Sequence, residues 1–399
     1  MAIHIYPVCN LKYLCPGDRR LSFRDSVLAL GAEQKGNFSL FLGGALFSGP
    51  EFGNLRNPAE FKNFEKDIKS ISKSLSGSKS GFPGIIACDL HPEYMSTKLA
   101  MALADGERAK GRRVRLIQTQ HHHAHVASCM VENGLKDKVI GVAFDGTGYG
   151  SDGHIWGGEF LVADYCDFKR AAHLAYVAMP GSDKAAEEVT RMAFSYIYST
   201  YGEDYKTLKL KLSRVLGRDR CLLYAEMIKK KINTPLTSSV GRLFDAVSGL
   251  IGLKETISHE GEAAIELEKV ADIHCSKRYR FVIKEDDEGR LIIEFWPMIK
   301  EIVSDLKKRE STGSISGKFH NTLAEAVMEA CISIRKRNGI NKVALTGGVF
   351  QNELLMIRVK RRLNDSGFSV YAHSKGKCSD IGLSIGQAVI ARTRKKRSM

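Results

Sequence analysis

Two buried strands that run directly into glycine-rich segments constrain the fold of this chain more than any other feature. An apolar run at 139–144 leads into DGTGYG at 145–150, and a second run at 342–345 leads into TGG at 346–348. Around them, apolar residues recur at helical spacing, for example within 61–75. Alternating strands and helices, with glycine turns at strand ends, are typical of an α/β architecture, which we therefore expect.

The pattern also suggests where the chain divides. A new strand begins near residue 136 after a helical stretch, and no repeat of 20–50 residues is visible. We expect an N-terminal extension over 1–25, a first lobe over 26–135, a second lobe over 136–392 and a basic tail over 393–399.

Composition excludes several classes of protein. The 399 residues contain no apolar run long enough to span a membrane, and the N-terminus lacks the pattern of a secretory signal. Nine scattered cysteines without a CxxC pair argue against a zinc ribbon and against a disulfide framework. We expect a cytoplasmic protein with reduced thiols and no membrane partner.

The chain is strongly basic, with 60 Lys and Arg residues against 45 Asp and Glu residues and a formal charge of +15. Such a surface attracts polyanions, including nucleic acid, nucleotides and acidic proteins. Part of the excess lies in 206–231 and 392–397, and neither segment interleaves its cations with a series of aromatic residues that could stack on bases. We interpret both segments as solvated, and we expect no nucleic-acid partner.

Four histidines lie within five positions in QHHHAHVA at 120–127. On a helix, His121 and His125 share one face, and neutral imidazoles at this spacing can chelate a transition metal. No Glu follows the first His, so this is not the HExxH motif of zinc proteases. A phosphate-binding cluster and a plainly exposed cluster remain alternatives.

The two glycine segments favour an anion site. In DGTGYG, Asp145 at the strand end suits a divalent metal, and the glycines let backbone N–H groups approach a phosphate. The segment TGGVFQN at 346–352 has the same strand-to-helix placement, which can present helix N-terminal amides to an anion. Neither is a Walker A loop, and a plain connecting turn is the alternative for each.

Beyond these features, the chain resembles the carbamoyltransferase half of the HypF hydrogenase-maturation proteins. The resemblance covers about residues 26–392 and preserves the order of the family motifs. The stretches that carry it are LALGAEQKGNFSL, IIACDLHPEYMSTKLA, QHHHAHVASCM, VIGVAFDGTGYGSDGHIWGGEFLVADY, AHLAYVAMPGSDKAAEE, TSSVGRLFDAVSGLIGL, HEGEAAIELE, FHNTLAEAV, ALTGGVFQNELL and SDIGLSIGQA.

The resemblance implies a two-lobed actin/sugar-kinase/Hsp70-type ATPase-like fold, with an adenine nucleotide and one divalent metal, iron or zinc, between the lobes. The implied reaction moves a carbamoyl group from carbamoyl-adenylate to the C-terminal cysteine thiolate of a HypE-like partner in nickel–iron hydrogenase maturation. Related families are the tRNA threonylcarbamoyl-transferases and the antibiotic O-carbamoyltransferases.

The resemblance also implies site residues. The metal ligands correspond to His121, His125, Asp145 and Asp380. The nucleotide-binding positions correspond to Gly148, Gly241, Asp245, Gly347, Gly348 and Asn352. Lys184 and Arg191 correspond to cations of the carbamoyl-adenylate site that would offset charge on the leaving adenylate. Glu260 lies in HEGEAAIELE, and His320 matches a family histidine whose role the sequence does not reveal.

Some family motifs are altered. The family's Asn-Asp-Gly-Gly reads Ser379-Asp380-Ile381-Gly382 here. The domains that form carbamoyl-adenylate in full HypF proteins have no counterpart in the matched region. We expect either that a separate protein supplies the adenylate or that this chain is a cut or reduced version of such a protein. The alternatives are an O-carbamoyltransferase that acts on a small-molecule alcohol, and a non-catalytic nucleotide- or tRNA-binding relative.

Overall fold

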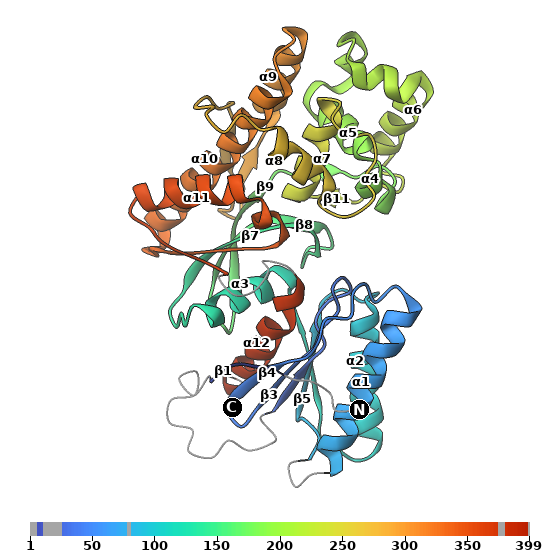
Figure 1. Ribbon diagram of the computed structural model, residues 1–399, viewed down its shortest axis with the longest axis vertical. Helices are drawn as coiled ribbons and strands as arrows, with labels where there is room; N and C mark the ends of the chain where they lie inside the picture. The colour runs from blue at the N-terminus through green and yellow to red at the C-terminus, as the bar shows by residue number, and fades with distance from the viewer. Residues whose placement is uncertain (1–5, 11–25, 78–80, 374–379, 398–399) are drawn as a thin grey trace.

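The computed structural model describes the backbone of residues 6–10, 26–77, 81–373 and 380–397, which form two lobes, each built on its own β-sheet (Figure 1). The strands of the first sheet follow the order β1-β4-β3-β2-β5-β6. Their bounds are β1 (Tyr6–Asn10), β2 (Val27–Ala29), β3 (Ser39–Leu42), β4 (Ala45–Ser48), β5 (Ile85–Asp89) and β6 (Arg115–Thr119). Apart from β1, the expected extension over 1–25 lies outside the described residues.

Two helices, α1 (Pro58–Gly77) and α2 (Met95–Ala109), cover one face of this sheet. The apolar spacing within 61–75 predicts a helix, and α1 confirms it. Phe64 and Ile68 on α1 are fully buried against Ile86 of β5 and Leu99 of α2. Because β5 lies between two parallel neighbours, all five of its residues are buried, as expected for a central parallel strand.

The second sheet follows the order β12-β13-β9-β8-β7-β14-β15, and the short β10 and β11 join it through β8. The bounds are β7 (Val139–Tyr149), β8 (Ile155–Ala163), β9 (Phe168–Leu174), β10 (Val177–Ala178), β11 (Leu236–Thr237), β12 (Val282–Glu285), β13 (Leu291–Glu294), β14 (Lys342–Thr346) and β15 (Ser369–Ala372).

The two sheets share one topology. In each lobe, three consecutive strands pair antiparallel, and the first of them also pairs in parallel with a later strand, which pairs in parallel with the last. The orders β4-β3-β2-β5-β6 and β9-β8-β7-β14-β15 are therefore equivalent. This duplicated α/β unit confirms the expected two-lobed fold.

The outer part of the second lobe is helical. Its helices are α4 (Asp183–Glu187), α5 (Val189–Tyr201), η3 (Gly202–Thr207), α6 (Lys211–Lys230), α7 (Val240–Leu250), α8 (Glu262–Val270), α9 (Trp296–Lys307), α10 (Thr312–Asn338), η4 (Gly348–Gln351) and α11 (Glu353–Asp365). The largest hydrophobic cluster lies between these helices and the second sheet. Residues 185–257 are largely helical.

Helices α3 (His121–Glu132) and α12 (Leu383–Arg397) pack between the two sheets (Figure 1). Although α12 follows the second lobe in sequence, its Gln387 accepts from Gly31 N at 2.9 Å and donates to Gly31 O at 3.0 Å in the first lobe. Helices α3 and α12 pack closely, because a Cβ on Gly386 of α12 would lie 1.9 Å from Ala124 O of α3. The lobe boundary near residue 136 stays a prediction.

One local expectation is wrong. DGTGYG was expected to be a turn, but β7 continues through it to Tyr149, and Tyr149 pairs with Ile155. The ladder is irregular between Phe144 and Gly148, so the glycines allow a distorted strand rather than ending it. The reversal of the chain follows at 150–154.

Among the described residues, no helix is both long and apolar enough to cross a membrane.

Candidate metal and nucleotide site

The histidine cluster lies in the interior, at the N-terminus of α3. Gln120 caps this helix by accepting a hydrogen bond from His123 N at 2.9 Å. The four histidines are at most 1% exposed, so they do not form a solvated surface cluster. His122 contacts the Gln120 side chain, and His123 Nε2 donates to Asp164 O at 2.7 Å. Burial lowers the pKa of His122 to about 3 and that of His123 to about 4, so both rings are neutral.

His121 and His125 converge with carboxylates from two other segments. Asp145 lies on β7, and Asp380 lies in the short η5 (Asp380–Gly382). From His125 Nε2, Asp145 Oδ2 is 2.9 Å away and Asp380 Oδ1 is 3.4 Å away. From His121 Nε2, the same two oxygens are 3.8 and 3.7 Å away. The structure thus brings together all four ligands that the resemblance implies.

The residues present fit a metal ion. His121 Nε2, His125 Nε2 and Asp145 Oδ2 are buried, and apart from the ion pairs within this cluster none has a hydrogen-bond partner. All four donor atoms lie within 4.8 Å of one another. Donors at about 2.1 Å from a tetrahedral ion are about 3.4 Å apart, which matches these separations. Two imidazoles and two carboxylates suit a borderline ion.

Further contacts orient two of these ligands. Asp89, at the end of β5, accepts from His121 Nδ1 at 2.8 Å and so directs Nε2 toward Asp145 and Asp380. Asp145 Oδ1 accepts from Gly146 N at 2.8 Å and Gly348 N at 3.4 Å, which leaves Oδ2 for the site. Sequence reasoning missed the role of Asp89, although its place at a buried strand end was a usable signal.

In the absence of a metal, the two imidazoles and two carboxylates of the site favour each other's charged forms. Burial by itself would lower the pKa of His121, but the carboxylates of Asp89, Asp145 and Asp380 raise it well above its usual value. The pKa of His125 is raised by the same contest between burial and carboxylates. Burial opposes ionisation of Asp145, yet the two imidazoles hold its pKa well below the usual range, and that of Asp380 is also lowered. A metal would displace the imidazole protons.

A cavity adjoins this cluster and draws residues from both lobes. Gly241, Asp245, Gly348 and Asn352, four of the six expected nucleotide-binding residues, line it together with Asp145 and Asp380. We call it the first cavity. Gly148 lines an adjacent second cavity, and Gly347 does not line either one.

Close approach of neighbouring atoms requires glycine at three positions of the site. Gly347 has φ +94°, and a Cβ there would lie 2.3 Å from Phe144 O. A Cβ on Gly241 would lie 2.8 Å from Gly146 Cα. Helix α7 therefore packs directly on the distorted segment of β7. Gly148 has a comparable constraint, because its Cβ would lie 2.4 Å from a ring carbon of His122.

Two polar pairs beside the first cavity were not foreseen. Arg242 Nε lies 2.6 Å from Asp245 Oδ2, and both side chains are at most 4% exposed. Asn352 caps α11 through Leu355 N and also contacts His320 Nε2 at 3.0 Å. His320 Nδ1 donates to Ser316 O at 2.8 Å, so Nε2 accepts from the Asn352 amide.

Of three further charged residues that sequence analysis singled out, Glu260 lines the first two cavities, whereas Lys184 and Arg191 do not. Glu260 lines both cavities, and a Cβ on Gly146 would lie 2.6 Å from its carboxylate. Desolvation of the carboxylate where the two cavities meet, with repulsion from Asp145 and Asp380, raises the pKa of Glu260 to about 7. Lys184 is 64% exposed and pairs with Glu187. Arg191 pairs with Glu188 and lines a third cavity. The catalytic assignment of the two cations stays a prediction.

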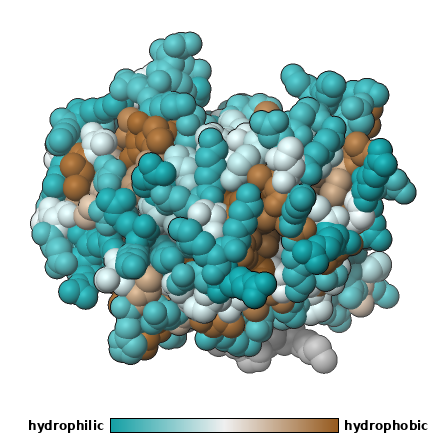
Figure 2. Space-filling view, turned by 90° about the horizontal axis from the view of Figure 1, so that it is seen from above, coloured by the Kyte–Doolittle hydropathy of each residue, from teal (hydrophilic) through white to brown (hydrophobic). Residues whose placement is uncertain are grey.

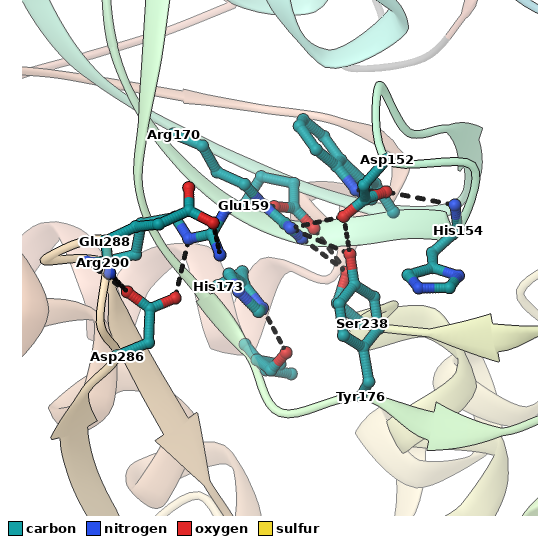
Figure 3. A network of polar contacts seen from close by, with 12 residues as sticks. Asp152, His154, Glu159, Arg170, His173, Tyr176, Ser238, Asp286, Glu288 and Arg290 are labelled. Carbon is teal, nitrogen blue, oxygen red and sulfur yellow. Dashed lines mark hydrogen bonds and ion pairs between the residues drawn. The ribbon is translucent and has the colours of Figure 1, made fainter.

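A buried network supports the base of the site (Figure 3). Arg170 Nε contacts Glu159 at 2.6 Å, and its guanidinium also contacts Asp152 and Tyr176. Ser238 donates to Glu159 at 2.5 Å. The next residue, Ser239, places its hydroxyl 2.7 Å from the carbonyl oxygens of both Asp145 and Gly146. Through Ser238 the network fixes the neighbouring Ser239, whose hydroxyl in turn holds the distorted part of β7.

Comparison with known proteins gives consistent matches. The family model described as the HypF Kae1-like domain matches residues 22–132. The model described as the carbamoyltransferase Kae1-like domain, second subdomain, matches residues 141–387.

Individual relatives agree with these matches. A carbamoyltransferase HypF of Synechocystis is 33% identical over 86% of this chain and 44% of its own length. A carbamoyltransferase HypF homolog of Cupriavidus necator is 32% identical over 92% of this chain and 91% of its own length. A crystal structure of full-length HypF in the phosphate- and nucleotide-bound form superposes with a TM-score of 0.81 at 38% identity, covering 92% of this chain and 55% of that one. The chain thus spans about half the length of several HypF proteins that it matches.

Proposed function

Because this chain belongs to the HypF family of carbamoyltransferases, we propose that it transfers a carbamoyl group from carbamoyl-adenylate to the C-terminal cysteine thiolate of a HypE-like acceptor protein, in nickel–iron hydrogenase maturation. The observation that carries this proposal is the convergence of His121, His125, Asp145 and Asp380 beside a cavity lined by the family's nucleotide positions. A separate protein is proposed to form the carbamoyl-adenylate.

The proposed reaction is an acyl transfer. The acceptor sulfur attacks the carbamoyl carbon and forms a C–S bond. The bond from that carbon to the adenylate oxygen breaks, and AMP leaves with the electron pair. An iron or zinc ion held by His121, His125, Asp145 and Asp380 would polarise the carbamoyl carbonyl.

The chain's own residues would bind and orient the donor. The adenylate would lie in the first cavity, whose lining includes Gly241 and Gly348. Arg242 is buried at the wall shared by the first and second cavities, where its charge would stabilise phosphate. Lys184 and Arg191 remain proposed cations for the leaving adenylate.

Mass spectrometry of the acceptor tests this function. Purified chain, loaded with iron or zinc, is incubated with authentic carbamoyl-adenylate and a HypE-like acceptor. We expect the acceptor to gain the mass of one carbamoyl group on its terminal cysteine, and an acceptor with serine there to gain none. His125→Ala should abolish transfer, whereas His274→Ala, on an exposed loop, should not affect it.

Two other outcomes would overturn the proposal. No mass gain on the acceptor with authentic donor would contradict the transfer itself. A carbamoylated low-mass alcohol, formed in place of the acceptor adduct, would instead identify a small-molecule O-carbamoyltransferase.

A further inference from the structure

The third cavity opens on the helical part of the second lobe, beside α6. It is lined by Leu216, Arg220, Leu223 and Tyr224 of that helix, and by residues near the start of α5. Helix α6 is interrupted at Gly217 (φ 72°, ψ 163°), between lining residues on either side. Leu222 and Leu223 are 39% and 55% exposed, so apolar side chains of α6 face solvent beside the cavity.

The third cavity adjoins the second cavity. Glu187 and Ile257 line the second cavity, whereas their chain neighbours Glu188 and Thr256 line the third. These two segments are joined by backbone hydrogen bonds, from Ile257 N to Glu187 O at 2.9 Å and from Thr190 N to Glu255 O at 3.4 Å. The second cavity in turn shares Arg242 and Glu260 with the first. The first two cavities therefore share a wall beside the metal cluster, and the third lies across the paired segments 187–190 and 255–257, next to α6.

The surface beside the third cavity is basic. Residues 206–231 contain nine Lys and Arg side chains and only two acidic ones. Within the part of the chain that the structure describes, Arg214, Arg218 and Arg220 on α6 form no salt bridge. The upper face of the molecule shows apolar patches set among hydrophilic side chains (Figure 2).

We propose that α6 and the third cavity form an exosite that binds the body of the acceptor protein, through an acidic face carrying an exposed apolar side chain, while the acceptor's C-terminus extends through the second cavity to the metal cluster. The inference rests on the proposed function and adds the recognition surface for its partner. Unpaired cations on α6 complement the acidic face, and the cavity beside Leu223 receives the apolar side chain.

The same observations favour a protein over RNA as the occupant. Single-stranded RNA is bound largely by stacking its bases on aromatic side chains. Tyr224, the aromatic residue of the third cavity, is 1% exposed and is covered by the Arg191 guanidinium at 4.7 Å. Exposed leucines next to cations match an amphipathic protein surface better than a sugar–phosphate backbone.

The test compares two acceptors with the metal-loaded 399-residue chain. One is the whole HypE-like protein, and the other is a synthetic peptide of its C-terminal residues. The variant Arg220→Glu/Leu223→Ser changes the exosite and no proposed metal or nucleotide residue. The matched control, Arg361→Glu/Ile357→Ser, makes the same changes on α11, where both side chains are exposed. In Figure 1, α11 lies on the other side of the second lobe from α6.

We expect the exosite variant to lose about tenfold or more in kcat/KM for the whole protein, mainly through KM, and to keep wild-type kcat/KM for the peptide. The control should match the wild type with both acceptors. Equal transfer to the whole protein by all three forms overturns the exosite while leaving the proposed function intact. Salt-sensitive tRNA binding that the variant loses, with unchanged transfer to the acceptor, also overturns it. Failure of the wild type with both acceptors contradicts the proposed function itself.

Discussion

Asp89 Oδ2 lies 2.8 Å from His121 Nδ1, on the side of the imidazole opposite the nitrogen that faces the carboxylates of Asp145 and Asp380. Asp89 is fully buried, and its other oxygen accepts from His91 N at 2.9 Å. Both oxygens therefore accept N–H groups. This contact fixes the tautomer of His121 and makes Nε2 the better electron donor.

We predict that Asp89→Asn weakens metal binding by about 10–100-fold, because the amide offers one acceptor where two donors must be satisfied and it carries no charge. Competition with a chelator, followed by elemental analysis, measures the effect. Asp105→Asn on the exposed face of α2 is the control and should bind metal like the wild type. Unchanged affinity in Asp89→Asn would show that His121 is oriented without Asp89.

The tight crossing of α3 and α12 gives a second prediction. A Cβ on Gly386 would lie 1.9 Å from Ala124 O, so Gly386→Ala must push α12 away from the helix that carries His121 and His125. We expect the free energy of unfolding to fall by about 1–3 kcal/mol, as for other overpacked cores. Metal affinity should fall as well.

The matched substitution for this prediction is Gly106→Ala, which lies within α2 and has open space around its Cβ. It should raise the free energy of unfolding by about 0.5–1 kcal/mol, because alanine favours the helix over glycine. Denaturant unfolding of both variants gives the comparison. If both substitutions changed the free energy of unfolding in the same direction, close packing of α12 on α3 would not explain the effect of Gly386→Ala.

The sequence predicts the metal ligands of the site more completely than it predicts the details of the fold. The i, i+4 spacing of His121 and His125 marks two ligands on one helical face, and the change from an apolar run to a glycine-rich segment marks Asp145. Asp380 is different, because it comes from a segment about 230 residues further along than Asp145 and has no local pattern. The family resemblance identified Asp380 as a ligand, and the structure places its carboxylate beside His121 and His125 of α3.

Other features could not be read locally because they depend on tertiary contacts. The duplicated sheet is a repeat of strand order and direction, which leaves no repeated residues in the sequence. The continuation of β7 through DGTGYG depends on pairing with β8, which overrides the local preference of glycine for turns. The role of His320 depends on its contact with Asn352, which is 32 positions away.

The buried pair of Glu159 and Arg170 gives a third prediction. Glu159 is fully buried and accepts from Arg170, Ser238 and the backbone N–H groups of Gly157 and Gly158. Glu159→Gln leaves the Arg170 charge buried without its main partner, and we expect the free energy of unfolding to fall by about 3–5 kcal/mol.

Thermal and denaturant unfolding check this loss. The control is Glu203→Gln, which breaks an exposed pair with Lys206 and should change stability by less than about 0.5 kcal/mol. The double variant Glu159→Met/Arg170→Met should recover part of the loss, since it removes the uncompensated charge. A small effect of Glu159→Gln alone would show that solvent reaches Arg170.

His320 predicts a pH dependence of stability. Burial lowers the pKa of His320 to about 4, whereas an unfolded chain binds this proton near its ordinary pKa of about 6.5. Between these values the unfolded state holds more protons, so the stabilisation that is fully present above about pH 6.5 is lost as pH falls toward 4. The loss from this group alone approaches about 3 kcal/mol.

We expect His320→Gln to be less stable than the wild type at pH 7.5 but to lose less stability between pH 7 and 4.5. Urea unfolding at pH 4.5, 5.5 and 7.5 compares it with His274→Gln, whose exposed ring should leave the wild-type slope unchanged. Parallel pH profiles for wild type and His320→Gln would mean that His320 does not take up a proton on unfolding.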